Sequence, residues 1–404
     1  MSSSLLYHPF GIRGYRYVRS DFCEGAVIFT VEQDRASLRC PVCGSAEVIA
    51  HGGEARLFRL VPIGSKPAHL FFEVPRVECP SCQITRQVHV TFADPRRHYT
   101  HAWERYALEL TRRMTIQDVA RHLGVSWDTI KEIQKRYLQR HFARPKLKHL
   151  QRLAIDEISV GKGHRYLTVV LDLDSGAVVF VGEGKGTAAL EPFWKRLRAS
   201  HARIQAVATD MAQPYVKAVH DHLPQATHVF DHFHVIKLYN EKLSDFRREL
   251  YREASAQKHK QVLKGTRWLL LKNPENLDSG RNERDRLDEA LRLNKPLATA
   301  YYLKEDLRQI WLQPDKATAR RILDDWTRRA KASGIAMLEK FANTLRLYRA
   351  GILAYYDYPI STGPLEGTNT KIQLIKRQAY GFRDQEFFKL KIYAIHTTKY
   401  ALVG

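Results

Sequence analysis

Three acidic residues in this sequence of 404 residues stand where strands or helices are expected to begin or end. Asp156 ends a short apolar run, Asp210 ends a strand-like run, and Glu366 lies at an expected helix start. Carboxylates from such positions could hold two divalent cations, one activating an attacking oxygen and the other stabilising the leaving oxygen of a phosphodiester. A single Asp at a strand end is more often a cap or a solvated turn, so the hypothesis depends on all three acids together.

Two further acids, Glu157 and Asp172, lie close to Asp156 in the sequence but are not assigned to this chemistry. Side chains alternate between the two faces of a strand, so Glu157 would point to the face opposite Asp156. The two adjacent acids are therefore expected to have different surroundings.

A second polar cluster, Asp231 and His234, follows the strand-like run 226–230. Residues three apart lie on one side of a helix's first turn, and this turn would stand near the carboxyl ends of the strands. His234 could then bind a phosphate oxygen or position an attacking water, with Asp231 orienting its ring or capping the helix. The alternative is a capping Asp with an incidental histidine. Nearness to the inferred metal site favours the functional interpretation.

Four of the five cysteines form two C-P-x-C pairs. Each pair places two thiolates on one tight turn, and two such turns complete a tetrahedral four-sulfur site that suits structural Zn²⁺. Alternating apolar runs at 55–60 and 69–74 are typical of ribbon strands between the pairs. A redox pair or unligated cysteines are the alternatives, and the fifth cysteine, Cys23, is expected to be a small buried hydrophobe. The expected zinc ligands are Cys40, Cys43, Cys79 and Cys82.

Residues 115–131 have the pattern of a helix-turn-helix. Apolar residues mark one face of a first helix, Gly124 breaks it, and Ser126 can cap a second helix whose buried side includes Ile130. The second helix would lie in the major groove of DNA. A helical hairpin without a DNA role is the alternative, but residues 86–148 hold 14 Lys and Arg against 6 Asp and Glu, which favours DNA. The expected contact residues are Ser126, Trp127, Asp128, Thr129, Lys131 and Lys135.

The formal charge of +22 and the pI near 9.8 indicate a polyanionic partner. Nucleic acid is favoured because phosphate neutralisation supplies much of its affinity for proteins. A basic helix at 366–377 would add Lys371, Lys376 and Arg377 to the DNA contacts, unless these form only a solvated basic face. With no run of 18 apolar residues and no secretory signal, a soluble cytoplasmic protein without a membrane partner is expected.

The elements expected after residue 150 follow the order βββαβαβ, with Asp156 and Asp210 ending the first and fourth strands. That order is typical of a ribonuclease-H-like mixed sheet, in which those two strands are neighbours. A long helical stretch separates Asp210 from Glu366, so it must be an insertion if both acids share one site. The tryptophans of this stretch are expected mainly in its hydrophobic core. The fold class is therefore α/β multidomain. The expected domains are a zinc ribbon at 1–95, a helix-turn-helix at 96–150, the first part of the core at 151–240, an α-helical insertion at 241–356 and the last part of the core at 357–404.

The sequence as a whole resembles the transposases of the bacterial insertion-sequence family called ISL-three. The likeness is carried by LAIDE, KGHRYLTVVLDLDSG, ATDMAQPY, FDHFHVIKL and PLEGTNTKIQLIKRQAYGF, and it extends over the zinc ribbon and helix-turn-helix. It implies a DDE-type enzyme whose catalytic acids fall on Asp156, Asp210 and Glu366, and whose motif after the fifth strand coincides with the Asp–His cluster above. One departure is Ser361-Thr362-Gly363, where members frequently have Thr-Asn-Gly; this affects a contact of the missing Asn and not the acid.

The resemblance also implies a function. Such an enzyme binds the terminal inverted repeats of its own element, hydrolyses DNA with two Mg²⁺ or Mn²⁺ ions, and joins the freed 3′-hydroxyls to target DNA. Handling two ends together implies a homodimer or a larger synaptic complex, in a bacterial cytoplasm and associated with the nucleoid through DNA. Two alternatives stay open. One is a DNA-binding regulator derived from a transposase, which would be expected to have lost an acid, and the other is a ribonuclease-H-like nuclease that cuts without joining.

Overall fold

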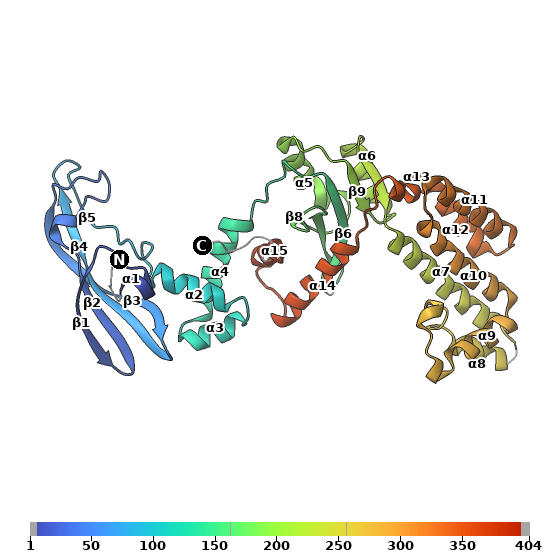
Figure 1. Cartoon of the computed structure of the whole chain (residues 1–404), viewed down its shortest axis with the longest axis horizontal. Coiled ribbons are helices and arrows are strands. Elements are labelled where there is room, and N and C mark those ends of the chain that lie inside the picture. Colours follow the sequence, from blue (N-terminus) through green and yellow to red (C-terminus); the bar gives the residue numbers. More distant parts are fainter. Residues whose placement is uncertain (1–5, 162, 256, 397–404) are drawn as a thin grey trace. The chain divides into compact units, whose positions relative to one another are not determined.

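The computed structural model describes residues 6–161, 163–255 and 257–396 (Figure 1). The chain divides into two compact units, Met1–His141 and Phe142–Gly404. Within the described ranges, no helix combines the length and the apolar character needed to cross a membrane.

A five-stranded sheet dominates the first part of the first unit. Its strands are β1 Arg16–Cys23, β2 Ala26–Glu32, β3 Ile49–Ile63, β4 Lys66–Cys79 and β5 Ile84–Gln87, accompanied by α1 Tyr7–Phe10 and the 3-10 turn η1 Arg35–Ser37. The order is β1-β2-β4-β3, with β5 beside β4. The two expected ribbon strands are confirmed as parts of β3 and β4, where Phe58 lies opposite Leu70 on the buried face. Strands β1 and β2 were not anticipated from the sequence.

Three helices follow, α2 His101–Leu110, α3 Ile116–Leu123 and α4 Trp127–Phe142. Gly124 ends α3 in the left-handed region at φ 60°, which glycine adopts without strain. Ser126 caps α4 by accepting a hydrogen bond from the Thr129 N–H at 3.2 Å. Ile130 and Ile133 are fully buried against α2 and α3. The helix-turn-helix expected from the sequence is therefore confirmed. Arg59 of β3 joins its turn to the sheet by donating a hydrogen bond to the Gly124 carbonyl at 3.1 Å.

The second unit is built on a mixed sheet in the order β10-β9-β6-β7-β8. Its elements are β6 Arg152–Gly161, β7 Arg165–Asp172, β8 Val178–Glu183, α5 Thr187–Ser200, β9 Ala206–Thr209, α6 Gln213–His222 and β10 Thr227–Phe230. Strands β6, β7 and β8 pair antiparallel, whereas β9 pairs parallel with both β6 and β10. The expected order βββαβαβ is confirmed, as is the neighbourhood of the first and fourth strands.

Helices cover both faces of this sheet (Figure 1). Leu153 and Ile155 of β6 pack on one face in the core that includes residues of α5 and α6. Ala154 and Ile158 pack on the other face, in the core that includes residues of the two carboxy-terminal helices, α14 Gly363–Gln378 and α15 Gln385–Tyr393. Alternation along β6 therefore sends even-numbered side chains toward α14 and odd-numbered ones toward α5 and α6.

A helical insertion separates β10 from α14. Its helices are α7 His232–Glu253, α8 Gln257–Gly265, α9 Glu283–Leu293, α10 Lys295–Arg308, α11 Lys316–Ala332, α12 Ala336–Leu347 and α13 Arg349–Leu353, with 3-10 turns η2 Pro274–Asn276, η3 Ser279–Arg281, η4 Gln309–Leu312 and η5 Ala354–Tyr356. Trp326 is fully buried and Trp311 nearly so, as expected, but Trp268 is 65% exposed, so the core expectation is wrong for that residue. The indole of Trp268 instead lies under the Arg267 guanidinium, 4.6 Å from the ring centroid.

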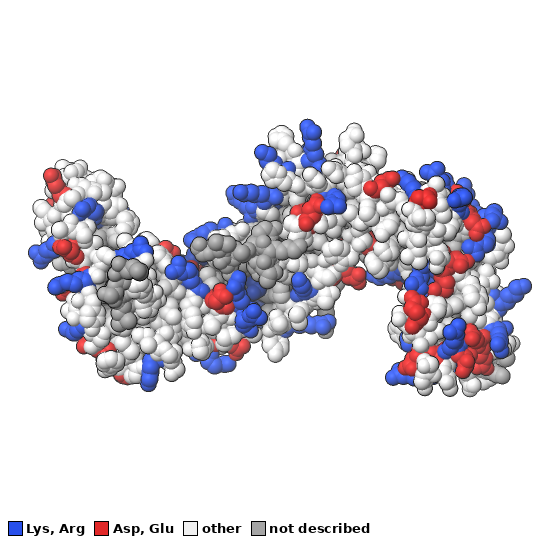
Figure 2. Space-filling model, viewed as in Figure 1, with Lys and Arg blue, Asp and Glu red and all other residues white. Residues whose placement is uncertain are grey.

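Charges of both signs are interspersed over the insertion on the face seen in Figure 2. Arg329, for example, contacts Asp306 at 2.6 Å and Asp325 at 2.7 Å. Exposed pairs of this kind add little stability, but they neutralise part of the positive charge of this segment.

Residues 145–150, which precede β6, pack against the core of the second unit. Leu147 and Leu150 are buried in the same core as Leu153, and Arg196 donates a hydrogen bond to the Pro145 carbonyl at 2.9 Å. The apolar residues of this segment are therefore part of the sheet's covering.

Candidate active site and metal centre

Asp156 lies inside β6 and not at its end, which corrects the expectation from the sequence. The strand continues to Gly161 because β7 pairs with it along the whole hairpin, with Asp156 opposite Val169. The parallel pairing with β9 stops earlier, at Ala154 opposite Ala208. Asp156 therefore lies just beyond the point where β6 and β9 separate.

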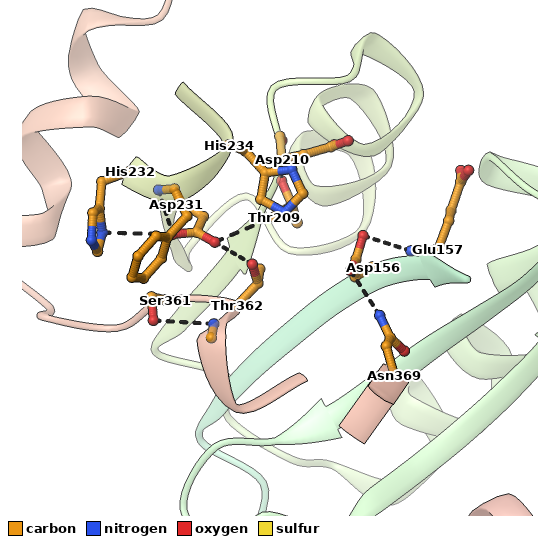
Figure 3. A network of polar contacts seen from close by, with 12 residues as sticks. Asp156, Glu157, Thr209, Asp210, Asp231, His232, His234, Ser361, Thr362 and Asn369 are labelled. Carbon is orange, nitrogen blue, oxygen red and sulfur yellow. Dashed lines mark hydrogen bonds and ion pairs between the residues drawn. The ribbon is translucent and has the colours of Figure 1, made fainter. Parts of the chain in front are cut away.

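The Asp156 carboxylate accepts two hydrogen bonds (Figure 3). Oδ1 accepts from the Glu157 N–H at 2.7 Å, and Oδ2 accepts from the Asn369 side-chain Nδ2 at 2.9 Å. Asn369 belongs to α14, on the even-numbered face of β6. The Glu157 carboxylate points the other way and accepts from the Tyr215 hydroxyl at 2.5 Å, on the α6 face. The expected separation of the two adjacent acids is confirmed.

The electrostatic surroundings of Asp156 are those of a desolvated acid among mixed charges. Burial raises the pKa of Asp156 above its ordinary value, and the negative charge of Asp210 adds to the rise. The hydrogen bond from the Glu157 N–H opposes this rise, as do the interactions with His234 and Lys237. Asp156, Asp210 and His234 therefore share one electrostatic environment, although they come from three elements.

Asp210 directly follows β9, as expected, and is half-buried. Its Oδ1 accepts from the Ala212 N–H at 3.0 Å, and its carbonyl accepts from the Thr209 hydroxyl at 2.6 Å. The hydroxyl hydrogen is used there, so Thr209 Oγ1 accepts from His228 Nε2 at 2.7 Å. Burial lowers the pKa of His228 to about 4, which keeps this imidazole neutral.

Glu366 lies in the first turn of α14, as expected, and its side chain is exposed. Asn369 and Gln373 follow at the third and seventh positions, which lie on the same helix face. Both contact β6, Asn369 at the Asp156 carboxylate and Gln373 at the Ser159 carbonyl, 2.6 Å away. Glu366 is therefore on the side of α14 that faces β6.

Asp231 is buried, with 1% of its side chain exposed. It caps α7 by accepting from the Phe233 N–H at 3.1 Å, and its Oδ2 accepts from the Thr362 hydroxyl, which precedes α14. His234 Nε2 stands 3.9 Å from the same Oδ2, and His232 Nδ1 stands 3.6 Å from Oδ1. The expected nearness of Asp231 and His234 is thus present, and Asp231 also contacts the chain just before the Glu366 helix.

In Figure 3, Asp210 and His234 lie between Asp231 and Asp156. Within the described ranges, however, no three of these carboxylate and imidazole groups come close enough together to hold one ion. This separation has two physical reasons. Like-charged carboxylates repel one another, and the Asp156 carboxylate is hydrogen-bonded to Asn369. Carboxylate and amide oxygens are nonetheless the ligands that Mg²⁺ and Mn²⁺ prefer, so the chemistry of this donor set fits such cations.

The four cysteines of the C-P-x-C pairs do form a metal-type cluster, with all four sulfurs within 4.8 Å of one another. Cys43 Sγ is 3.6 Å from Cys79 Sγ, and Cys40 Sγ is 4.0 Å from Cys82 Sγ. A tetrahedral site with Zn–S bonds near 2.3 Å has sulfurs about 3.8 Å apart, so the geometry fits zinc. Backbone N–H groups of Cys43 and then Val42 lower the pKa of Cys40 to about 6, which favours the thiolate.

The fifth cysteine, Cys23, is exposed, so the expectation that it is buried is wrong. It ends β1 at the hairpin to β2, where Glu24 and Gly25 turn the chain with positive φ. A residue at the tip of a two-stranded ribbon has little to pack against.

The side chains expected to contact DNA lie mostly at the surface. At the start of α4, Ser126, Trp127 and Asp128 are exposed, and the Lys131 ammonium stands 5.4 Å from the Trp127 ring centroid. The remaining expected contacts are Thr129 and Lys135, both half-buried, and on α14 the exposed Lys371 and Arg377 with the half-buried Lys376. Helix α14 ends at Gln378, one residue after the end of the basic helix expected at 366–377.

Sequence reasoning missed three residues that organise this site: Asn369, Thr362 and His228. The position of Asn369 near the site could have been predicted from the sequence, because it lies three positions after Glu366 and so on the same helix face. No sequence pattern indicates the roles of Thr362 and His228, since tertiary contacts determine their partners.

Three family models match the chain. The transposase domain of family ISL3 matches residues 153–392, which is more than half of the chain. The helix-turn-helix domain of transposase family ISL3 matches residues 88–138, and the zinc-finger of transposases IS204, IS1001, IS1096 and IS1165 matches residues 37–82. ISL3 is the ISL-three family that the sequence motifs resemble.

Individual proteins are also similar. The transposase for insertion sequence element IS1001 of Bordetella parapertussis is 36% identical over 361 residues, covering 88% of each chain. The transposase for IS1557 of Mycobacterium tuberculosis is 30% identical over 402 residues, covering 93% of this chain and 90% of its own. A solved structure, the Drosophila P element transposase strand transfer complex, is 12% identical with a TM-score of 0.34, over 62% of this chain and 77% of that one. The two bacterial likenesses extend over most of both chains.

Proposed function

The chain belongs to the ISL3 family of transposases, and we propose that it cuts DNA at the terminal inverted repeats of its own insertion sequence and joins the freed 3′-hydroxyls to target DNA. The supporting observation is the arrangement of the acids. Asp156 lies in β6 and Asp210 directly follows the neighbouring strand β9, and α14, which carries Glu366, is hydrogen-bonded to β6 at Asp156 itself.

We assign Asp156, Asp210 and Glu366 to two divalent cations, Mg²⁺ or Mn²⁺. When bound, such ions activate the attacking oxygen and stabilise the leaving oxygen of a phosphodiester. His234, which shares the environment of Asp156, would bind a phosphate oxygen or position the attacking water. Asp231 would orient the His234 ring, which lies 3.9 Å away.

DNA recognition would belong to the segments before about residue 150, a zinc ribbon at 1–95 and a helix-turn-helix at 96–150. Zn²⁺ on the four cysteines would stabilise the first, and the exposed start of α4 would enter the major groove. The core, residues 151–240 and 357–404, would cut and join DNA, and the basic residues of α14 would contact the DNA backbone. Because two ends react together, we expect a homodimer or a larger synaptic complex, acting in the bacterial cytoplasm and nucleoid.

The test is a cleavage and strand-transfer assay with DNA carrying the element's ends. Asp156→Asn, Asp210→Asn and Glu366→Gln should each abolish cleavage and joining, because each removes a charged cation ligand. End binding, measured by mobility shift in Ca²⁺, should stay nearly intact. Glu157→Gln is the matched control, since that acid lies beside Asp156 in sequence but on the opposite face of the sheet.

The outcomes separate the alternatives. Full strand transfer by any of the three acid variants would refute the assignment of that acid. Cutting without joining by the native protein would indicate a nuclease, and end binding without either reaction would indicate a regulator.

A further inference from the structure

Asn369 is the one residue of α14 whose side chain contacts Asp156 among the described hydrogen bonds. Its Nδ2 donates to Asp156 Oδ2 at 2.9 Å, and its amide oxygen Oδ1 takes no part in this contact. Oδ1 is buried and has no hydrogen-bond partner in the described part of the chain. Leaving a buried amide oxygen without a partner is unfavourable, and such atoms in folded proteins usually have one.

The position of this oxygen is defined by its neighbours. Oδ1 and Nδ2 belong to one planar amide, whose nitrogen faces the Asp156 carboxylate and whose oxygen points to the other side (Figure 3). Asn369 also follows Glu366 at the third position, on the face of α14 that is held against β6 by Gln373. The unsatisfied oxygen thus belongs to a side chain that contacts Asp156 and lies one helical turn after Glu366, two acids that we assign to cation binding.

The chemistry of this group points to a cation and not to another hydrogen-bond donor. Amide carbonyl oxygens of Asn are regular ligands of hard divalent cations, alongside carboxylates. Rotation of the Asn369 amide by half a turn would put Oδ1 against Asp156 Oδ2. Two acceptor oxygens in that arrangement repel each other unless a cation lies between them. Without the ion, the Asn369 amide can donate a hydrogen bond to Asp156. With the ion bound, the rotated amide can bind the same ion as Asp156.

We propose that Asn369 is a ligand, through Oδ1, of the divalent cation that Asp156 holds, so that one turn of α14 supplies two ligands, Glu366 and Asn369. This rests on the proposed function, which places a cation at Asp156. The simpler alternative is that Asn369 only positions the Asp156 carboxylate through its N–H group.

The first measurement is the affinity of the full-length protein for Mn²⁺ alone, followed by electron paramagnetic resonance. Asn369→Ala should weaken the Asp156-dependent site at least about tenfold, which is the loss typical for removing groups that bind or support a metal. Asn369→Asp should retain Mn²⁺, because a carboxylate oxygen replaces the amide oxygen. Gln373→Ala is the matched control: it removes another amide that joins α14 to β6, at Ser159, and should leave the affinity unchanged.

The second measurement separates a ligand from a positioning group. Protein labelled with ¹³C at the Asn side-chain carbonyl carbon should show a ¹³C coupling to bound Mn²⁺ by electron-nuclear double resonance, and the Asn369→Asp protein with the same label should bind Mn²⁺ without that coupling. Asp156-dependent Mn²⁺ binding without ¹³C coupling in the native protein would overturn this inference and leave the proposed function standing. Absence of any Mn²⁺ binding that depends on Asp156 would overturn the cation assignment in the proposed function, and this inference with it.

Discussion

Thr362 donates a hydrogen bond to the buried carboxylate of Asp231, although the two residues are 131 positions apart. Asp231 caps α7, the first helix of the insertion, and Thr362 immediately precedes α14, which carries Glu366. The bond therefore joins the start of the first helix of the insertion to the segment that follows the insertion. It also fixes where the Glu366 helix begins relative to β10 and the strand beside it.

Thr362→Val is expected to destabilise the second unit and to slow cleavage. The valine has the same shape but no hydroxyl, so Asp231 Oδ2 loses a donor inside the protein, which typically costs about 1–3 kcal/mol of the free energy of unfolding. Cleavage should fall because the start of α14 is no longer fixed. Thr362→Ser keeps the hydroxyl and serves as the control. Unfolding midpoints and cleavage rates equal to those of the native protein would show that the bond has neither role.

His234→Ala is expected to fold and to bind DNA ends, but to cut at least about tenfold slower, a threshold set below the usual contribution of a proton-transferring group. The reason is its position, within 3.9 Å of Asp231 and in the electrostatic environment of Asp156. His232→Phe is the control, because the His232 ring packs among Phe233, Trp311 and Tyr355. If His234→Ala lowered the melting temperature and left cleavage per folded molecule unchanged, the residue would be structural.

Zinc removal is expected to unfold the cysteine-bearing end of the first unit. Structural zinc contributes folding free energy directly, so a chelator, Cys40→Ser or Cys79→Ser should each expose this segment to proteolysis and abolish end binding. Cys23→Ser should have no such effect, because Cys23 is exposed and outside the cluster. Elemental analysis checks the premise directly, since folded protein containing no zinc would contradict it.

His228 is expected to make the second unit less stable in mild acid. Its pKa is lowered by burial to about 4 in the folded protein, whereas an unfolded histidine titrates near 6.5. Between these pH values His228 is protonated in the unfolded chain and neutral in the folded chain. The free energy of unfolding therefore falls as the pH is lowered, by about 1.4 kcal/mol per pH unit. This stability is fully present above about pH 6.5.

The measurement compares native protein with His228→Gln, which can still donate to Thr209 but does not titrate. Unfolding midpoints from pH 7.5 to pH 5 should fall more steeply for the native protein. Parallel curves for the two proteins would mean that His228 takes up its proton in the folded state as readily as in the unfolded one.

Local patterns in the sequence determined most of the elements around the site. The alternation in 153–158 separates Asp156 from Glu157, because neighbouring side chains of a strand face opposite sides whatever the strand packs against. The C-P-x-C spacing brings each cysteine pair onto one turn, and Gly124 ends its helix because glycine adopts positive φ without strain. These features depend on residues a few positions apart.

Other features were decided only by the tertiary structure. Strand β6 runs on beyond Asp156 because β7 offers it a partner, and strand length depends on such pairing more than on intrinsic preference. The exposure of Cys23 follows from a hairpin whose tip lacks neighbours. The contacts that organise the site, Thr362 with Asp231 and Asn369 with Asp156, join residues 131 and 213 positions apart. No local periodicity encodes such pairs, because only the packing of α14 against β6 and the closing of the insertion bring their side chains together.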